Sequence, residues 1–175
     1  MNKSASEIIK YRVTYLEMKK PPSFDWPKVL KYRLNILKAE NIPSWYFLFF
    51  YKQVGKKYYW TDWLNKSEKE LNNFVSDKNV FFYTLIKDGW PAGFFMLDYR
   101  EKQICNLSFL GLVEEAIGLG LGEYLLKTAI LTAWDSKKIG SLTVNTCSLD
   151  HKRALRLYQK HGFSPVEIKD FEKFI

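Results

Sequence analysis

Five stretches of the chain have the spacing or the composition of β-strands. Apolar and polar positions alternate in residues 11–18, and Pro21-Pro22 ends that stretch. Runs rich in β-branched and aromatic residues follow at residues 79–87, 90–99, 103–113 and 141–146. Asp88-Gly89 is a strong hairpin signal between two of them, and Glu101-Lys102 is expected to form the next turn. The pattern therefore predicts three antiparallel strands in the middle of the chain, one strand before them and one after.

Helical spacing predicts further elements in the first half of the chain. Pro27 suits the first turn of a helix over residues 26–39. The mostly apolar stripe of that helix is Val29, Leu30, Arg33, Leu34 and Leu37. A second helical segment is expected over residues 45–54, ended by Gly55. Ser67 and Glu70 form a capping box ahead of a short helix that runs through Phe74.

Length and composition favour one domain over residues 1–175. The chain is 47% hydrophobic and 17% aromatic, which is enough to bury a substantial core. No apolar run reaches the length of a membrane span, and residues 1–10 lack the apolar core of a signal peptide. We therefore expect a cytoplasmic protein that does not enter membranes. Cys105 and Cys147 lack metal-ligand spacing, so we expect buried thiols at strand ends and no metal.

The net charge of +8 comes from 27 Lys and Arg against 19 Asp and Glu. Such an excess is compatible with binding to nucleic acid. The basic residues are mostly lysines scattered among acids, however, and they form no sustained basic face. A nucleic-acid partner is thus less expected than a phosphate-rich small molecule, which Lys152 and Arg153 are placed to meet if they are more than solvated surface charge.

The chemistry concentrates in residues 107–123, where an apolar run is followed by Gly118, Gly120 and Gly122. Helical spacing resumes directly after these glycines, so the stretch predicts a strand, a glycine turn and a helix without a linker. The first turn of a helix has unpartnered backbone N–H groups that hold an anion. The spacing differs from the dinucleotide fingerprint, and no Lys-Ser or Lys-Thr follows as in a P-loop. Taken alone, the glycines are equally compatible with a tight packing turn.

A second motif supports the anion site. Residues 150–163 follow the strand at 141–146 with the sequence Asp-His-Lys-Arg-Ala-Leu-Arg-Leu-Tyr-Gln-Lys-His-Gly-Phe. Together the two segments resemble the Gcn5-related N-acetyltransferases (GNAT), over roughly the last 70 residues. The family's pyrophosphate-binding segment corresponds to Ile117, Gly118, Leu119, Gly120, Leu121 and Gly122. Its later helix corresponds to His151, Ala154, Leu157, Tyr158, Gly162 and Phe163. Ile117 stands where the family usually has Arg or Gln, and His151 stands where it has Asn.

The resemblance implies an α/β fold, the GNAT-like three-layer α-β-α arrangement. Its mixed, mostly antiparallel sheet has six to seven strands, with a parallel splayed pair at the cofactor cleft. The backbone of Leu110 and Leu112 is then expected to hydrogen-bond the pantetheine arm of coenzyme A. Asn145 is expected near the same gap, although it would serve equally well to cap the strand end.

The implied reaction moves an acetyl group from acetyl-CoA to a primary amine. Tyr158 matches the family's general acid, and a neutral phenol suits that role, although its place on an apolar helical stripe also fits simple packing. Glu114 and Glu115 follow a strand end and are the first candidates for a general base. Weaker candidates for the base are Asp98, Asp150 and His151.

The acceptor itself is not encoded in these motifs and is expected to be a small-molecule or peptide amine. Six aromatic residues are candidates to line its pocket, although ordinary core packing is favoured for most of them: Trp45, Tyr46, Tyr58, Tyr59, Trp60 and Trp63. A homodimer through the C-terminal strands is a further expectation from the family. Two other functions stay open: a non-catalytic acyl-CoA sensor, suggested by Ile117 and His151, and a basic nucleic-acid-binding domain.

Overall fold

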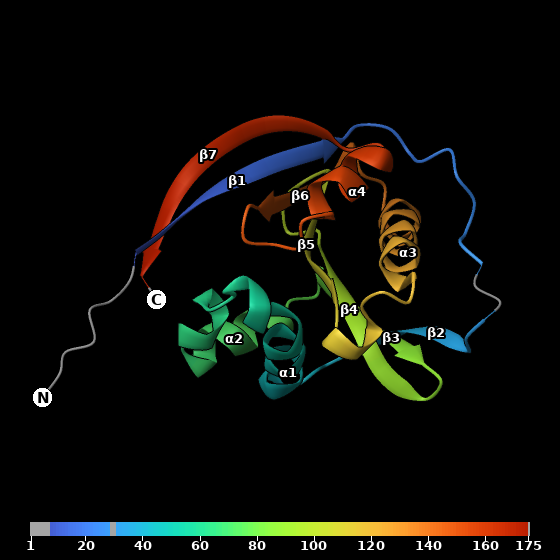
Figure 1. The fold of residues 1–175 in the computed structure, drawn as a ribbon. Coiled ribbons are helices and arrows are strands. Elements are labelled where there is room, and N and C mark those ends of the chain that lie inside the picture. The colour runs from blue at the N-terminus through green and yellow to red at the C-terminus, as the bar shows by residue number, and fades with distance from the viewer. Residues whose placement is uncertain (1–7, 29–30, 175) are drawn as a thin grey trace, which may run out of the picture.

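A single sheet of seven strands forms the middle of the molecule (Figure 1). The computed structural model describes residues 8–28 and 31–174. Its strands are β1 (Ile8–Met18), β2 (Leu34–Ala39), β3 (Val80–Lys87), β4 (Trp90–Asp98), β5 (Ile104–Leu112), β6 (Ser141–Cys147) and β7 (Ser164–Phe174). They lie in the order β2-β3-β4-β5-β6-β1-β7, and every neighbouring pair is antiparallel except β5 and β6. This confirms the predicted mixed sheet with one parallel pair.

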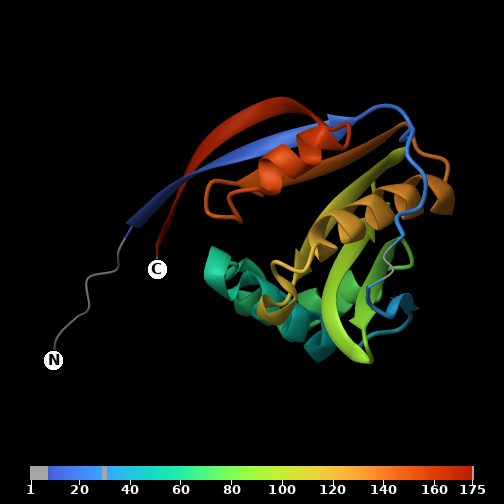
Figure 2. The same ribbon diagram turned by 45° about the vertical axis from the view of Figure 1, so that its right-hand side comes forward.

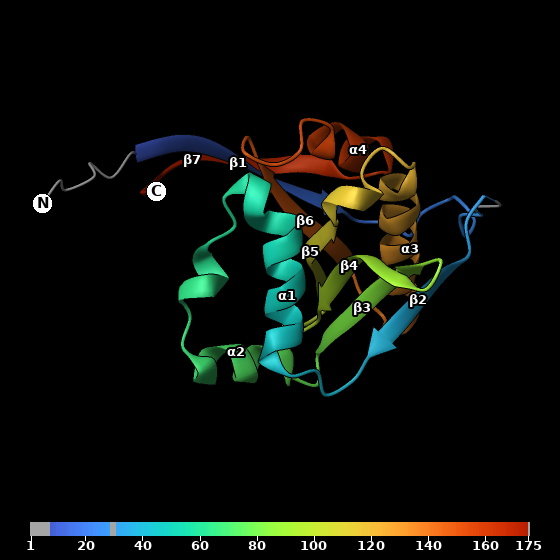
Figure 3. The same cartoon turned by 60° about the horizontal axis from the view of Figure 1, so that its bottom comes forward.

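Helices cover both faces of the sheet. They are α1 (Ser44–Gly55), α2 (Glu68–Val75), α3 (Leu121–Ser136) and α4 (Ala154–Lys160), with short 3-10 turns η1 (Lys56–Tyr58), η2 (Asp62–Asn65) and η3 (Glu114–Ala116). Figure 3 shows α1 and α3 on opposite sides of the central strands. Alternating side chains of β4 explain this, because Phe94 contacts Phe50 of α1 at 5.3 Å between ring centroids, whereas Phe95 stacks on Tyr83 of β3. The three-layer arrangement is thereby confirmed.

The capping box at the start of α2 forms as predicted. Ser67 Oγ accepts a hydrogen bond from the Glu70 backbone N–H at 3.3 Å, and the Glu70 carboxylate accepts one from the Ser67 N–H at 3.0 Å. The Ser67 hydroxyl also donates to the Glu70 carboxylate at 2.7 Å, and this bond, with those from Lys66 and from the Ser67 N–H, lowers the pKa of Glu70 to about 2. The helix at residues 45–54 is also confirmed, as α1.

The predicted helix over residues 26–39 is wrong. Residues 34–39 form strand β2, which pairs antiparallel with β3 from Leu34 opposite Lys87 to Ala39 opposite Phe82. In β2 Leu34 and Ile36 are half-buried while Asn35 and Leu37 are exposed, so the true period is two. An unpaired edge of β3 overrides a weak helical stripe. Val29 and Leu30 of that stripe lie outside the described residues.

The last motif contains less helix than expected. Within residues 150–163 only Ala154–Lys160 is helical, and a turn of residues 148–153 precedes it. After α4 the chain turns at Gly162, where φ is +99°, and enters β7, which pairs with β1 along nearly its whole length. In Figures 1 and 2 these two strands form an arm that curves away from the helices.

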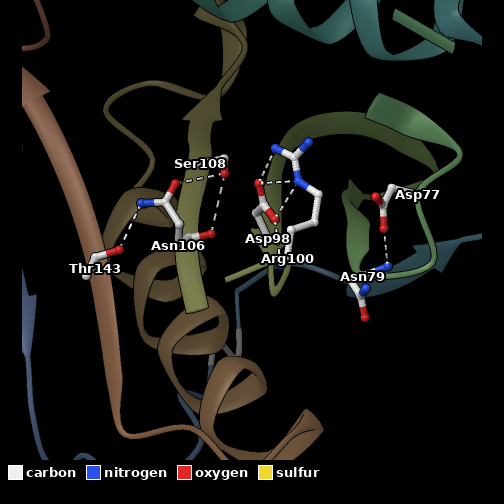
Figure 4. Close-up of polar contacts among 7 residues, drawn as sticks. All are labelled: Asp77, Asn79, Asp98, Arg100, Asn106, Ser108 and Thr143. Atoms are coloured by element: carbon white, nitrogen blue, oxygen red, sulfur yellow. Dashed lines mark hydrogen bonds and ion pairs between the residues drawn. The ribbon is translucent and has the colours of Figure 1, made fainter. Parts of the chain in front are cut away.

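The parallel strands β5 and β6 separate after a short contact. Only Ile104–Asn106 of β5 pair with Ser141–Thr143 of β6. Beyond that point β5 pairs with β4 alone and β6 with β1, and Figure 2 shows the two ribbons diverging. At the branching point Asn106 Nδ2 donates to Thr143 Oγ1 at 2.9 Å, and Ser108 Oγ donates to Asn106 Oδ1 at 2.8 Å (Figure 4). These side chains hydrogen-bond where the ladder ends, and the sheet opens beyond them.

Candidate functional site

A cavity of about 1020 Å³ occupies the opening between β5 and β6. Its lining includes the glycine turn, the first turn of α3 and the start of α4, together with β1, the end of α1 and the aromatic segment after it. Leu110, Leu112 and Asn145 line it from the two separated strands. The structure therefore brings both sequence motifs to one cavity.

The glycine turn at one end of the cavity is shaped to receive an anion. Gly118 and Gly120 have φ of +85° and +79°, in the left-handed region that favours glycine. An added Cβ at either position would meet no atom within 4 Å, so space lies in front of this backbone. Gly120 is the N-cap of α3 and supplies no side-chain cap to the 16-residue helix. The N–H groups and positive dipole of that first turn thus remain available to a ligand.

Glu123, in the first turn of α3, is held by α4. Its carboxylate accepts hydrogen bonds from Lys160 Nζ at 2.8 and 3.0 Å, and His161 Nε2 lies 3.1 Å from Glu123 Oε1. The bond from Lys160 is the main reason that the pKa of Glu123 lies below its ordinary value. The negative charge beside the glycine turn is therefore partnered by a lysine.

Tyr158 of α4 lines the same cavity and is buried. Its ring packs edge-on against Phe163 at 5.8 Å. Burial raises the pKa of its phenol above the ordinary value of 10, and the charge of Asp150 raises it further. Within residues 8–28 and 31–174, no hydrogen-bond partner is found for its hydroxyl. Tyr158 thus presents a protonated hydroxyl to the cavity at neutral pH.

The two glutamates expected to act as bases lie elsewhere. Glu114 and Glu115, at η3, line a smaller neighbouring hollow of about 430 Å³ together with Lys52 and Lys56. Glu114 is also ion-paired with Lys57 of η1. Neither glutamate lines the larger cavity.

The remaining predicted residues divide between the cavity and the surface. Ile117, Leu121 and Gly122 line the cavity, whereas Leu119 is exposed and does not line it. His151 lines it from the turn before α4, where its Nδ1 accepts a hydrogen bond from the Arg153 N–H at 3.3 Å. Lys152 and Arg153 line the cavity as well.

Of the weaker candidates for a base, Asp98 is bound to Arg100 at the far end of β4, as Figure 4 shows. Asp150, in contrast, lines the cavity.

The aromatic residues separate in the same way. Tyr58, Tyr59, Trp60 and Trp63 line the cavity. Trp45 is 65% exposed on α1 and does not line it. Tyr46 packs on Phe50 and Phe82, with its hydroxyl 3.0 Å from Thr84 Oγ1, so it belongs to the core.

Several cavity residues carry no local signal in the sequence. Tyr11 and Val13 enter from β1, Tyr51 from α1, Phe109 from β5 and Lys173 from β7. Only the pairing of distant strands and the packing of α1 on the sheet bring them to one place.

The cysteines do not behave as nucleophiles. Burial raises the pKa of Cys105 to about 12, and it also raises the pKa of Cys147 at the end of β6. Both thiols therefore stay protonated at neutral pH. Across residues 8–28 and 31–174, no group of three His, Cys, Asp or Glu is arranged to hold a metal ion. In the same part of the chain no helix is long and apolar enough to cross a membrane.

A family model described as the acetyltransferase (GNAT) family matches residues 39–163. A comparison with curated protein sequences finds no match. Among solved structures, a GCN5-related N-acetyltransferase from Kribbella flavida is 12% identical at a TM-score of 0.59, with 93% of this chain and 57% of that chain covered. A tandem GNAT protein from the clavulanic acid biosynthesis pathway is 13% identical at a TM-score of 0.64, with coverages of 93% and 53%.

A third similar structure is an aminoglycoside acetyltransferase from an uncultured soil metagenomic sample, in complex with sisomicin. It is 13% identical at a TM-score of 0.58, and the match covers 73% of this chain and 86% of that one. The chain spans only 51% to 61% of the length of the first four solved structures that it matches. At these identities the likeness establishes the fold.

Proposed function

Because the chain belongs to the acetyltransferase (GNAT) family, whose members' fold supports acyl transfer, we propose that it moves an acetyl group from acetyl-CoA to a primary amine. The observation that carries this proposal is that the uncapped first turn of α3, with left-handed Gly118 and Gly120, shares one cavity with a protonated Tyr158. An anion-binding end and a proton donor are what transfer from a phosphate-bearing thioester requires.

The residues of the glycine turn fit the pyrophosphate of coenzyme A. Space lies in front of Gly118 and Gly120, and the helix dipole of α3 favours an anion there. Glu123 does not oppose it, because Lys160 holds that carboxylate. Leu110 and Leu112 are proposed to hydrogen-bond the pantetheine arm through their backbone, with Asn145 and His151 at the opposite wall.

Acetyl-CoA, when bound, supplies the acetyl group as an activated thioester. The acceptor amine loses a proton to solvent, its nitrogen bonds to the acetyl carbon, and the carbon–sulfur bond breaks. Tyr158 is proposed to give its proton to the departing sulfur and to regain one from water. Backbone N–H groups of the separated β5 strand would steady the developing oxyanion. Glu114 and Glu115 are proposed to accept the amine's proton only through water, since they line a separate hollow.

The test is a calorimetric titration of the protein with acetyl-CoA, with ATP and desulfo-CoA as comparison ligands. We expect acetyl-CoA and desulfo-CoA to bind and ATP not to bind. Release of free thiol in the presence of a panel of primary amines then measures transfer. Absence of acetyl-CoA binding would overturn the proposal.

A non-catalytic acyl-CoA sensor is the second candidate. It is favoured by Ile117, an aliphatic and partly exposed side chain at a position where the family usually has Arg or Gln. A sensor would bind acetyl-CoA in the same titration, yet release no thiol with any amine of the panel.

A further inference from the structure

The three carboxylates that line the cavity differ in how their charge is balanced. Asp62 is paired with Lys173 at 2.8 Å, and Glu123 is paired with Lys160 at 2.8 Å. Asp150, the third, forms no ion pair with any residue of the described chain. Asp150 is half-buried and lines the cavity, so a cationic ligand can form a charge-assisted hydrogen bond with its carboxylate.

Neutral donors hold the Asp150 carboxylate in place. Thr146 Oγ1 and the Cys147 N–H each donate to Oδ2 at 2.8 Å, and Trp60 Nε1 donates to Oδ1 at 3.1 Å. A carboxylate has roughly four acceptor positions, so one remains, on the Oδ1 side. The three donors orient this charge without neutralising it, and they leave room for one more donor.

Trp60, which donates to this carboxylate, belongs to an aromatic cluster. Its ring lies 5.5 Å from that of Tyr51 and 5.8 Å from that of Phe109 between centroids, and Tyr58 lines the same cavity. A Cβ on Gly55 would come within 2.3 Å of Trp60 Cβ, so the absence of a side chain at Gly55 lets the indole reach its position. Aromatic faces attract cations and pack against apolar bodies.

Asp150 also adjoins the proposed proton donor. Asp150, Tyr158 and Tyr58 line the same cavity, and the charge of Asp150 adds to the effect of burial in raising the pKa of both phenols. A cation held at Asp150 would therefore share the cavity with Tyr158.

We propose that Asp150 binds the ammonium group of the acceptor, and that the acceptor is a cationic amine whose amine-bearing carbon is attached to an apolar, ring-sized body without an anionic group. The inference rests on the proposed function and specifies its substrate class. Asp150 acts in recognition, and Trp60 positions it and forms part of the apolar wall.

The experiment titrates three matched probes onto the protein, both alone and saturated with desulfo-CoA. Phenethylamine carries the ring and the cation, 2-phenylethanol replaces the cation by a neutral hydroxyl, and phenylalanine adds a carboxylate. We expect phenethylamine to bind about tenfold or more tightly than either of the others, since hydrogen bonds to charged groups have that strength. Equal affinities for the three probes overturn the inference without use of any variant.

Variants assign the effect to Asp150. Asp150→Asn should weaken phenethylamine binding about tenfold and leave 2-phenylethanol unchanged, because only the charge is lost. Asp135→Asn, at an exposed position of α3, makes the same change in net charge and should alter neither. Thr146→Val removes one donor to Asp150 but keeps the charge, so the preference for phenethylamine over 2-phenylethanol should persist. An unchanged preference in Asp150→Asn, or its equal loss in Thr146→Val, contradicts the proposal.

The same samples separate this inference from the proposed function. If acetyl-CoA binds and thiol is released, but phenylalanine binds as tightly as phenethylamine, the transferase proposal stands and the proposed role of Asp150 is wrong. If acetyl-CoA fails to bind while Asp150 still selects phenethylamine in the protein alone, the cation site stands and the transferase proposal fails.

Discussion

Two groups of lining residues, which we name the coenzyme end and the acceptor end after the ligands proposed for them, are built from different parts of the chain. The coenzyme end is made of backbone: left-handed Gly118 and Gly120 and the uncapped first turn of α3, all within a few residues. The acceptor end is made of side chains from distant segments, as in the bond from Trp60 to Asp150 across 90 residues of sequence. A backbone site leaves a short motif in the sequence, whereas a side-chain site does not.

The ends also differ in charge. At the coenzyme end the one lining carboxylate, Glu123, is partnered by Lys160, and the helix dipole is positive. At the acceptor end Asp150 accepts a hydrogen bond from Trp60 and forms no ion pair with any described residue. The lining thus supports the proposal of an anion beside the glycine turn and a cation beside Asp150, as a phosphate-bearing thioester and an amine would require.

The substitution with the largest expected effect lies in the glycine turn of the coenzyme end. Gly120→Asp should lower acetyl-CoA affinity more than 100-fold, because an N-cap carboxylate takes the α3 N–H groups and repels phosphate. Isothermal titration calorimetry measures it, and phenethylamine binding should be unchanged. Gly89→Asp is the matched control, since Gly89 also has positive φ and open space but lies in the β3–β4 turn. Wild-type affinity in Gly120→Asp would contradict the assignment of this turn.

The next change concerns Tyr158, which lines the same cavity. Tyr158→Phe should lower kcat about 100-fold, as expected for loss of a general acid, with acetyl-CoA affinity within about twofold of wild type. Steady-state thiol release measures kcat. Tyr99→Phe removes a buried hydroxyl outside the cavity, where Tyr99 donates to the Ala133 carbonyl at 3.1 Å, and should leave kcat unchanged. A wild-type kcat in Tyr158→Phe would reduce Tyr158 to a packing residue.

The third test changes the packing of Gly55 against Trp60 at the acceptor end. Gly55→Ala should lower the free energy of unfolding by roughly 1–3 kcal/mol and weaken phenethylamine binding, because the new Cβ displaces Trp60. Urea unfolding gives the first quantity and calorimetry the second. Gly140→Ala, whose Cβ would meet its nearest atom at 3.6 Å, is the control. Acetyl-CoA binding should be unaffected in both, and a joint loss of both ligands in Gly55→Ala would argue against two separately built ends.

The smallest effect concerns pH and the Glu123–Lys160 pair. The folded-state pKa of Glu123 lies below its ordinary value of 4.5, so its contribution to stability is present above pH 4.5 and lost as pH falls below that value. Glu123→Gln should therefore be less stable than wild type at pH 6, with the difference shrinking towards pH 3. Urea unfolding at several pH values tests this, with Glu101→Gln in an exposed turn as control. A difference that does not change with pH would show that the ion pair adds no stability.

Much of the fold follows from local patterns. The strands β1 and β3 to β6, the helices α1 and α3 and the capping box of α2 lie where periodicity, Asp88-Gly89 and Ser67/Glu70 predict them. The error at β2 has a physical cause: residues 26–39 carry a weak helical stripe, and pairing with β3 decides their structure. The local pattern of residues 26–39 gives no sign that this stretch pairs with the distant strand β3.

The residues of the candidate site also divide into those that local motifs indicate and those that only long-range contacts bring to the cavity. The glycine turn and Tyr158 are proposed as site residues from motifs, and the structure brings both to one cavity. Tyr11, Phe109 and Lys173 reach the cavity only through sheet order, and Asp150 gains its significance from Trp60 and from the pairing of the other two carboxylates. No spacing in the sequence connects residues 60 and 150.

The most direct test of two separately built ends is one calorimetric series in which acetyl-CoA and phenethylamine are each titrated onto wild type, Gly120→Asp and Asp150→Asn. We predict opposite effects in the two variants. Gly120→Asp should abolish acetyl-CoA binding and leave phenethylamine binding unchanged. Asp150→Asn should weaken phenethylamine binding and leave acetyl-CoA binding unchanged. If each variant loses both ligands, or neither variant loses either, the account of the cavity is wrong.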